Sequence, residues 1–340
     1  MSKYDVNIDL ANEAKKDMVK ALETNNKKVL NRVGAFASLY DINYDEYKDP
    51  VLVLKTEEPG SKQIIAAEYD KIENVCYDMI NHLVNDCIVM GSKPLTVQDA
   101  IICGKMDKGI ILRIVNAIAE ACNNVGCVLT GGETSEQPGV LEAGKYILTS
   151  SIVGIVEKQN IVDGSDIRIG DVVIALESSG IHTNGYTLVR KIMKDNPAIL
   201  DVYIGQRSFI DTILEPHRCY YNQLKDLFGK KLINGMAHIT GGGIRENLNR
   251  ILPIGVNAEI DLSQYEILDI FKVLRNWGDV EDDEMLRTFN LGVGLVLVTS
   301  LPNSQAVMAH LLNQGVNCKI IGKITEGEQK VVCTGKLKWD

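Results

Sequence analysis

One pattern recurs in the second half of the chain: a short apolar segment, a polar loop that contains glycine, and then a segment with helical spacing. It occurs at residues 172–193 and again at residues 236–252. Apolar runs this short have the length of β-strands, and the segments after the loops place apolar residues three and four apart. Strands that alternate with helices favour an α/β fold, in which the loops that follow strands gather at one edge of a sheet.

The N-terminal half contains longer periodic segments. Residues 70–91 form the clearest predicted helix, because their apolar side chains fall on one stripe. A second helix is predicted for residues 108–124, which run into an Asn-Asn-Val-Gly sequence typical of helix ends. Strands are expected at 127–130 and 146–156, the second buried on both faces. Further predicted elements are strands at 51–54, 291–300, 318–324 and 330–333 and a helix at 304–313.

The chain of 340 residues is longer than one hydrophobic core usually serves, so two domains are expected. Turn-forming residues between 163 and 171 predict the boundary. The chain is therefore divided into an N-terminal domain at 1–165 and a C-terminal α/β domain at 166–340, each of which mixes strands and helices.

The composition excludes several classes of protein. The formal net charge of -9 argues against nucleic acid and anionic membranes as partners, since both require a basic surface. The eight cysteines include no C-x-x-C pair, which excludes a zinc ribbon and a thioredoxin-like motif. No segment has the composition of a signal peptide or a membrane span, so a cytoplasmic protein is expected.

The sequence 130–134 follows a predicted strand and contains two glycines and Glu133. Glycines allow a backbone to approach a ligand closely, and the Glu133 carboxylate can bind Mg²⁺ or a substrate amine. The alternative is a tight turn with an exposed acid.

The loop 178–185 is rich in small and polar residues and precedes a predicted helix. His182 can donate a hydrogen bond to phosphate or act as a general acid, and Asn184 can orient an amide or phosphate oxygen. The alternative is an ordinary capped helix start.

Two further loops are candidates for phosphate binding. Thr240 and the three glycines after it place backbone amides before a helix, where an anion can bind, although such a sequence is also typical of a flexible bend. In the loop 55–62, Ser61 and Lys62 can hold phosphate and the acids a metal ion. The alternative there is a solvated charged loop.

The five histidines show no metal-binding pattern in the sequence. His82 and His310 lie within predicted helices and are interpreted as packing or surface residues. His217 and His238 have no metal-ligand spacing relative to each other. The chain also lacks a P-loop, a protein-kinase motif set, a nucleophile elbow and a strand-linked G-x-G-x-x-G.

Taken together, the sequence resembles the phosphoribosylformylglycinamidine cyclo-ligases, the aminoimidazole ribonucleotide synthetases of purine biosynthesis. The matching segments occur in the family's order along almost the whole chain. They are 84–86 with Gly91 and Pro94, 131–134 with Glu136 and 138–139, 153–158, 161–165, 178–180, His182, 184–186, 188–192, 214–216, 237–243, 287–290 and 292–294.

This resemblance implies two α/β domains and a homodimer in which the N-terminal sheets join into a barrel. It implies that domain 1–165 binds nucleotide and dimerises. The implied reaction is ATP-dependent ring closure of formylglycinamidine ribonucleotide to aminoimidazole ribonucleotide in de novo purine synthesis. ATP phosphorylates the amide oxygen, and an amidine nitrogen then attacks the activated carbon.

The resemblance also implies roles for particular residues. Glu57 and Asp86 are expected to bind Mg²⁺, and Glu133, His182 and Asn184 are expected to face the substrate as catalytic residues. The nucleotide is expected to contact Ser61, Lys62, Asp86 and Asp99. The substrate phosphate is expected at the backbone of Thr240, Gly241, Gly242 and Gly243.

The chain departs from the family mainly near its N-terminus. The family sequence T-D-G-V-G-T-K corresponds to residues 56–62 here, where the acid is Glu57 and a glycine is replaced by Glu58. Glycines are also lost in 4–12 and 33–37. Two alternative hypotheses therefore accompany the cyclo-ligase: a paralogue that uses ATP on another substrate, and a non-catalytic binding protein that has lost ATP.

Overall fold

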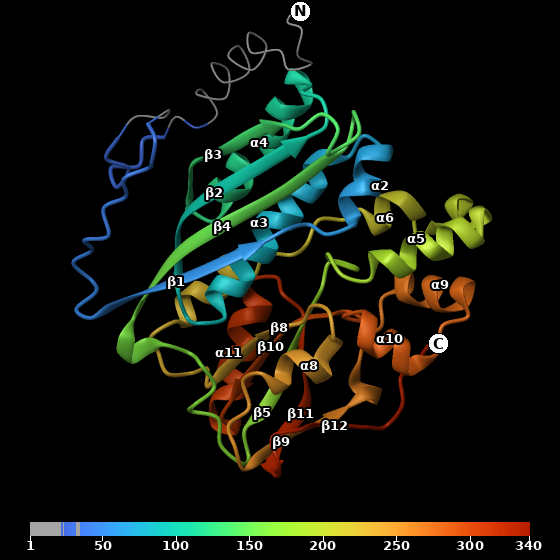
Figure 1. Cartoon of the computed structure of the whole chain (residues 1–340). Helices are drawn as coiled ribbons and strands as arrows, with labels where there is room; N and C mark the ends of the chain where they lie inside the picture. The colour runs from blue at the N-terminus through green and yellow to red at the C-terminus, as the bar shows by residue number, and fades with distance from the viewer. Residues whose placement is uncertain (1–21, 23, 32–34) are drawn as a thin grey trace, which may run out of the picture. The chain divides into compact units, whose positions relative to one another are not determined.

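The computed structural model of the chain describes residues 22, 24–31 and 35–340 (Figure 1). The departures from the family at residues 4–12 and 33–34 lie outside these residues. The described chain divides into two compact units. The first unit extends to Cys87 and includes Ser92–Lys158, and the second comprises Ile88–Gly91 and Gln159–Asp340.

The first unit contains a four-stranded sheet in the order β1-β4-β2-β3. Strand β4 pairs antiparallel with β1 and β2, whereas β2 and β3 are parallel. A parallel pair needs a crossover, which helix α4 (Lys108–Asn124) provides. The strands are β1 (Pro50–Glu57), β2 (Lys93–Cys103), β3 (Val128–Glu136) and β4 (Tyr146–Glu157).

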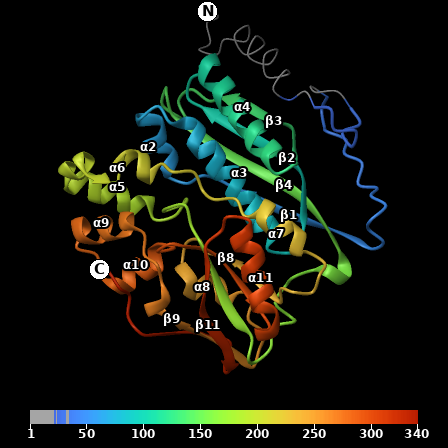
Figure 2. The ribbon, with the colours of Figure 1, turned by 180° about the vertical axis from the view of Figure 1, so that it is seen from behind.

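Helices α3 (Ile72–Ile88) and α4 cover one face of this sheet, behind it in Figure 1 and in front of it in Figure 2. The apolar stripe of α3 is buried from Ile72 to Ile88, and each buried Ile, Leu or Met contributes roughly 1.5–3 kcal/mol by leaving water. Asp107 caps α4 by accepting a hydrogen bond of 3.1 Å from the amide of Ile110. The two helices predicted at 70–91 and 108–124 are confirmed.

No helix of the described residues covers the opposite face of the sheet. Along most of β4 buried and exposed residues alternate, so the prediction that this strand is buried on both faces is wrong except near Val156. The exposed residues include Leu52 and Leu54 of β1 and Ile147 of β4. Their cross-strand register places these three on the same face, and we call them the open apolar face.

Two segments predicted as loops belong to strands. Residues 131–134 continue β3, because they pair with Gln98–Ile101 of β2. The register shifts beside Gly131, as in a β-bulge, and the strand continues beyond it. Lys55–Glu57 likewise form the end of β1, and helix α2 (Lys62–Glu68) begins soon afterwards.

The second unit contains a six-stranded sheet in the order β12-β9-β11-β5-β10-β8. All neighbours are antiparallel except β12 and β9. The C-terminal strand predictions are confirmed, whereas β2 and β9 were not predicted. The strands are β5 (Val172–Glu177), β8 (Gly235–His238), β9 (Val256–Asp261), β10 (Val293–Thr299), β11 (Cys318–Glu326) and β12 (Val331–Thr334), and a separate hairpin consists of β6 (Tyr203–Ile204) and β7 (Arg207–Ser208).

Helices α8 and α11 lie on opposite faces of this sheet, with α8 in front in Figure 1 and α11 in front in Figure 2. The helices are α5 (Tyr186–Asp195), α6 (Phe209–Ile213), α7 (Tyr221–Leu224), α8 (Gly243–Asn249), α9 (Asp269–Gly278), α10 (Asp282–Thr288) and α11 (Leu301–Asn313). None of the helices in the described part of the chain is long and apolar enough to cross a membrane.

The topology of the second sheet brings three loops to one edge. Strands β5 and β8 both run antiparallel to β10, which lies between them. The loops that leave β5 and β8 therefore share an edge with the segment that enters β10. The loop after β5 contacts the segment before β10 through a hydrogen bond of 2.9 Å from the Ser178 amide to the Gly292 carbonyl.

Candidate active site

His182 lies in the loop that follows β5, at this shared edge. Its side chain is buried, and the backbone amide of Ser179 donates a hydrogen bond of 3.2 Å to its Nε2 atom. Because Nε2 accepts this bond, the neutral imidazole carries its proton on Nδ1. The ring is thus held in one tautomer and one orientation, as proton transfer requires.

The backbone of His182 is in the left-handed region, with φ of 66°. For a residue other than glycine this costs on the order of 1 kcal/mol, so the surrounding structure must impose it. Asn290 does so, because its buried side-chain amide donates to the carbonyls of Gly180 (2.9 Å) and Ile181 (3.2 Å). The Asn290 Oδ1 atom in turn accepts from the Gly292 amide at 2.8 Å.

Gly294 of β10 makes room for the His182 ring. A Cβ atom at this position would lie 2.7 Å from His182 Cε1 and 2.0 Å from the Tyr220 hydroxyl. That hydroxyl donates a hydrogen bond of 2.7 Å to the Glu177 carbonyl, and burial raises the pKa of Tyr220. The absence of a side chain at Gly294 is therefore a packing requirement of the site.

Two further histidines extend from His182 in a chain. The His182 and His217 rings stack with their centroids 3.8 Å apart and an interplanar angle of 21°. The Nε2 atoms of His217 and His238 are 2.8 Å apart, so one of them donates a hydrogen bond to the other. His217 and His238 have no metal-ligand spacing in the sequence, and the fold brings them together as hydrogen-bond partners.

These three histidines have nitrogen atoms within 4.8 Å of one another, close enough to suggest a metal ion. An ion must lie in the plane of each imidazole that binds it, in line with the nitrogen lone pair. Two rings stacked at 3.8 Å cannot both meet that condition. The arrangement is accordingly a hydrogen-bonded and stacked cluster of three histidines.

The loop between β8 and α8 lies beside the His182 loop. A Cβ atom at Gly241 would be 3.1 Å from Asn184 Oδ1, so the predicted substrate residue Asn184 and the predicted phosphate loop are in contact. The Asn247 side chain donates to the carbonyls of Thr240 and Gly241 at 3.3 and 3.1 Å. These bonds turn the Gly241 amide away from Asn247.

Two of the four amides that are predicted to bind a phosphate donate to backbone carbonyls in this structure. The Gly242 amide donates to the Arg287 carbonyl at 3.1 Å, and the Gly243 amide donates to the Thr240 carbonyl at 3.0 Å. A phosphate contact at this loop therefore depends on the amides of Thr240 and Gly241.

In the first unit, the predicted metal ligands Glu57 and Asp86 lie close together. The ammonium of Lys55 is 2.6 Å from Glu57 Oε1 and 3.1 Å from Asp86 Oδ2. His82 Nε2 lies 3.8 Å from the Glu57 carboxylate and 3.6 Å from that of Asp86. Partial burial lowers the pKa of Lys55, but the two carboxylates together outweigh it and raise that pKa.

This arrangement does not fit a magnesium site. Mg²⁺ requires oxygen ligands at about 2.0–2.1 Å in octahedral geometry. The Lys55 ammonium bridges the two carboxylate oxygens that would bind the ion, and an ion placed between them would meet the ammonium. In this structure the ionic partner of Glu57 and Asp86 is therefore Lys55.

The predicted nucleotide residue Lys62 is fully buried at the start of α2. Its ammonium lies 2.9 Å from Asp78 Oδ1 and 2.8 Å from Oδ2, and the Asp78 side chain is also fully buried. Ser61 is half-buried at the N-cap of α2. For Lys62 to contact a phosphate, the ion pair with Asp78 would have to open.

Asp99 and Glu133 lie on the paired strands β2 and β3. Burial raises the pKa of the half-buried Asp99 to about 7. Gly132 faces it, and a Cβ there would lie 2.0 Å from Asp99 Oδ1. Glu133 is exposed on β3, where its carboxylate is accessible to a ligand.

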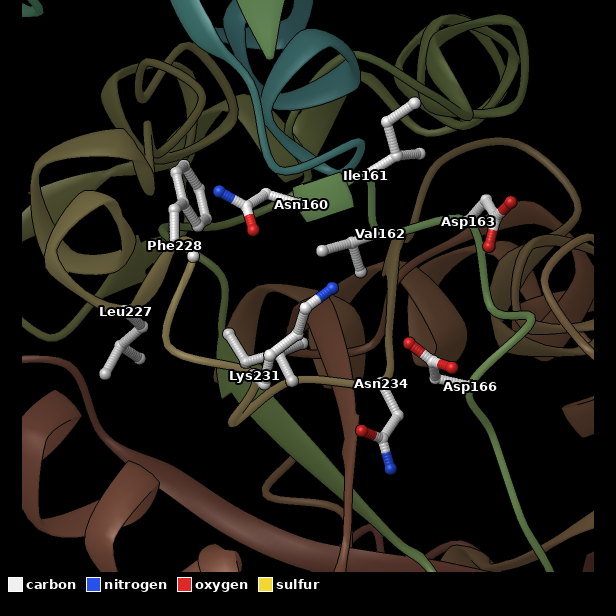
Figure 3. Close-up of a pocket in the computed structure, with 11 residues that line it drawn as sticks. Asn160, Ile161, Val162, Asp163, Asp166, Leu227, Phe228, Lys231 and Asn234 are labelled. Atoms are coloured by element: carbon white, nitrogen blue, oxygen red, sulfur yellow. The ribbon is translucent and has the colours of Figure 1, made fainter. Parts of the chain in front are cut away.

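A small cavity in the second unit contains none of the predicted site residues (Figure 3). It has a volume of about 20 Å³, which is room for roughly one water molecule. Asp163, Lys231 and Asn234 are among its lining residues, and the Lys231 ammonium donates to the Gln159 carbonyl. The cavity is too small for a nucleotide or a substrate.

Sequence reasoning missed five residues of these clusters. Lys55 was included only as part of a charged loop, His82 was interpreted as a packing or surface residue, and His217, His238 and Asn290 were given no role in the site. The partners of His217, His238 and Asn290 are far away in the sequence, so no local spacing could reveal them. The strand alternation of Lys55 and Glu57 was the one available signal, because residues two apart on a strand share a face.

The sequence matches two families of domains in chain order. Residues 37–156 match the family described as AIR synthase related protein, N-terminal domain, and residues 168–334 match the corresponding C-terminal domain.

Curated relatives match almost the whole chain. The phosphoribosylformylglycinamidine cyclo-ligase of Caldanaerobacter subterraneus is 43% identical over 96% of this chain and 98% of its own length. The enzyme of the same name from Bacillus cytotoxicus is 40% identical over 95% of this chain and 94% of its length, and that of Chromobacterium violaceum is 38% identical over 96% and 95%.

Solved structures of more distant proteins share the fold. Thiamine-monophosphate kinase from Stenotrophomonas maltophilia has a TM-score of 0.68 at 15% identity, with 96% of this chain and 97% of that chain covered. HypE of E. coli has a TM-score of 0.67 at 16% identity, with 96% and 94% covered. With identities near 40% over nearly its full length, this chain belongs to the phosphoribosylformylglycinamidine cyclo-ligase family.

Proposed function

We propose that this chain catalyses the ATP-dependent ring closure of formylglycinamidine ribonucleotide to aminoimidazole ribonucleotide in de novo purine synthesis. The observation that carries the proposal is the 43% identity over 96% of the chain to a relative named for this reaction. The geometry of the loops around His182 supports it, because a proton-transfer group, an amide and backbone N–H donors lie at one edge of one sheet.

The reaction needs a good leaving group and a nucleophile. Phosphorylation of the substrate amide oxygen turns that oxygen into a leaving group, and the amidine nitrogen then attacks the activated carbon and expels phosphate. The attacking nitrogen loses a proton to solvent as the ring closes, and His182, whose Nδ1 atom carries a proton, is proposed as the general acid for the departing phosphate. Asn184 is proposed to orient the substrate, and the amides of Thr240 and Gly241 are proposed to bind its phosphate.

Glu133 is the remaining proposed substrate contact. Its carboxylate is exposed on β3 and can accept hydrogen bonds from an amidine or amine. A carboxylate that pairs with the amidinium group favours the correct orientation of the nitrogen that attacks.

ATP is the proposed phosphoryl donor. Among the proteins that share the fold are HypE, solved in complex with ATP, and PurL of T. maritima, solved with AMPPCP. Ser61, Lys62, Asp86 and Asp99 remain the proposed nucleotide residues. Mg²⁺ neutralises phosphate charge in reactions of this class, but we do not place an ion between Glu57 and Asp86, because Lys55 bridges them.

A second copy of the chain is the proposed partner. The open apolar face exposes 70% of Leu54 and 45% of Leu52 on a sheet whose other face is covered by helices. Apolar side chains gathered on one open sheet face are typical of an interface. We propose that two such faces pack into a dimeric barrel, in a protein of the cytoplasm whose eight cysteines are all free thiols.

One observation favours a second candidate function. Lys55 between the two predicted metal ligands, together with the burial of Lys62, removes two groups from the predicted nucleotide site. A non-catalytic protein that binds the substrate without ATP would retain the His182 loop and lose these groups.

A turnover assay distinguishes the two functions. The purified chain is incubated with ATP, Mg²⁺ and formylglycinamidine ribonucleotide, and both ADP and the aminoimidazole product are measured. Substrate-dependent ADP release with product in equal amount establishes the cyclo-ligase. Substrate binding by calorimetry without ADP or product would instead support the non-catalytic protein, and His182→Asn serves as the inactive control.

A further inference from the structure

Lys55 occupies the position that a divalent cation would take in the cluster of Lys55, Glu57, His82 and Asp86. Its ammonium lies 2.6 Å from one carboxylate oxygen and 3.1 Å from the other, and the two carboxylates come from β1 and α3. We infer that Lys55 is a built-in cation that replaces a metal ion between Glu57 and Asp86, so that this carboxylate pair does not recruit Mg²⁺.

The local structure explains why these groups meet. Lys55 and Glu57 are two residues apart on β1 and therefore point to the same face of the sheet. Both are only partly exposed. Thr56, which lies between them, and Leu54, which precedes Lys55, are exposed on the other face. His82 and Asp86 are four residues apart on α3 and share one side of that helix.

The charges of the cluster support the inference. Two carboxylates that share a small volume repel each other and need a cation. A divalent ion binds two carboxylates strongly only when the full negative charge of both is available. The Lys55 ammonium already neutralises part of that charge. The ammonium and a metal ion would also compete for the same two oxygens, Glu57 Oε1 and Asp86 Oδ2.

The test measures Mn²⁺ binding to the purified full-length chain by electron paramagnetic resonance, with Mn²⁺ as the probe for Mg²⁺ and with no nucleotide or substrate present. We expect Lys55→Met to bind Mn²⁺ at least tenfold more tightly than the wild-type chain. Lys55→Arg keeps the positive charge and is expected to show no gain. Lys55→Met/Glu57→Gln is expected to lose the gain, because one of the two oxygens no longer carries charge.

Lys191→Met is the matched control, because Lys191 also pairs with a carboxylate, that of Asp195, but on α5 in the second unit. It changes the net charge equally and is expected to leave Mn²⁺ binding unchanged. Circular dichroism melts of each variant establish that it is folded. Equal Mn²⁺ affinity in the wild type and Lys55→Met would overturn the inference, as would a gain of the same size in Lys191→Met.

The inference rests on the proposed function only in its choice of Mg²⁺ as the ion. Metal binding is measured here without turnover, so a chain that proves inactive in the cyclo-ligase assay still gives a result. Tight Mn²⁺ binding by the wild type would sink the inference and leave the proposed reaction intact.

Discussion

The buried ion pair of Lys62 and Asp78 allows a quantitative prediction. If Lys62 serves mainly as the partner of Asp78, its replacement lowers the stability of the first unit, whereas a lysine that serves mainly as a nucleotide ligand has little effect on stability. Both side chains are fully buried, and the ammonium lies 2.8 Å from the nearer carboxylate oxygen. Lys62→Met would leave the Asp78 carboxylate buried opposite a thioether. Removal of one partner of a buried ion pair costs about 3–5 kcal/mol. We therefore expect the free energy of unfolding of the first unit to fall by about that amount.

A double variant tests whether the loss comes from an unpaired charge. In Lys62→Met/Asp78→Val no charge remains buried, and replacement of a whole buried pair by apolar residues is often neutral. We expect the double variant to recover most of the stability that Lys62→Met loses. A simple loss of packing at Lys62 would give no such recovery.

Hydrogen–deuterium exchange under native conditions suits this measurement, since peptides from α2 and α3 report on the first unit separately. The chain's two tryptophans, Trp277 and Trp339, both lie in the second unit, so their fluorescence during denaturation is an internal control that should not change. If Lys62→Met lowers the stability of α2 and α3 by less than about 1 kcal/mol while ATP affinity collapses, the structural reasoning is refuted and Lys62 is a nucleotide ligand.

Three further predictions concern the candidate site and its neighbours. Gly294→Ala places a Cβ 2.7 Å from His182 Cε1. We therefore expect thermal melting to show a loss of about 1–3 kcal/mol in stability, and kcat to fall at least tenfold. A normal kcat would show that the position of the His182 ring is unimportant. His217→Ala removes the ring stacked on His182 and should lower kcat more than His217→Phe, which keeps a ring there; equal kcat in the two variants would rule out positioning by stacking. Burial raises the pKa of Asp99 to about 7 from an ordinary value near 3.9, so the folded state binds its proton more tightly than the unfolded state. The free energy of unfolding should therefore fall as the pH rises from about 4 to about 7, and Asp99→Asn should make this fall less steep in denaturant titrations at several pH values.

Much of the fold was predictable from the sequence because its signals are local. The apolar stripe of α3 and the helix-ending sequence after Asn124 depend only on neighbouring residues, and both predicted helices are present. The predictions failed where pairing across a sheet overrides local preference. Gly131 and Gly132 are poor strand formers, yet pairing with β2 carries β3 through them.

The candidate site was predictable in part for the same reason. The loops that contain His182 and Asn184 and the glycines after Thr240 were located by composition, and the fold places them in contact at Gly241. Their partners were not located, since His217 and His238 reach the site from other elements. Only the order of β5, β10 and β8 in the sheet determines that these elements meet.

The glycines near the predicted site residues suggest a more general reading of this sequence. Gly132 was interpreted as a position where the backbone approaches a ligand, but it makes room for a side chain of the protein, as does Gly294, to which the sequence analysis assigned no such role. Gly132 accommodates the Asp99 carboxylate, and Gly294 accommodates the His182 ring. In each pair the residue beside the glycine is one whose orientation the proposed reaction requires. A glycine on a strand can therefore indicate the position of a neighbouring polar side chain as well as the approach of a ligand. The space left by the missing Cβ determines where that side chain can lie.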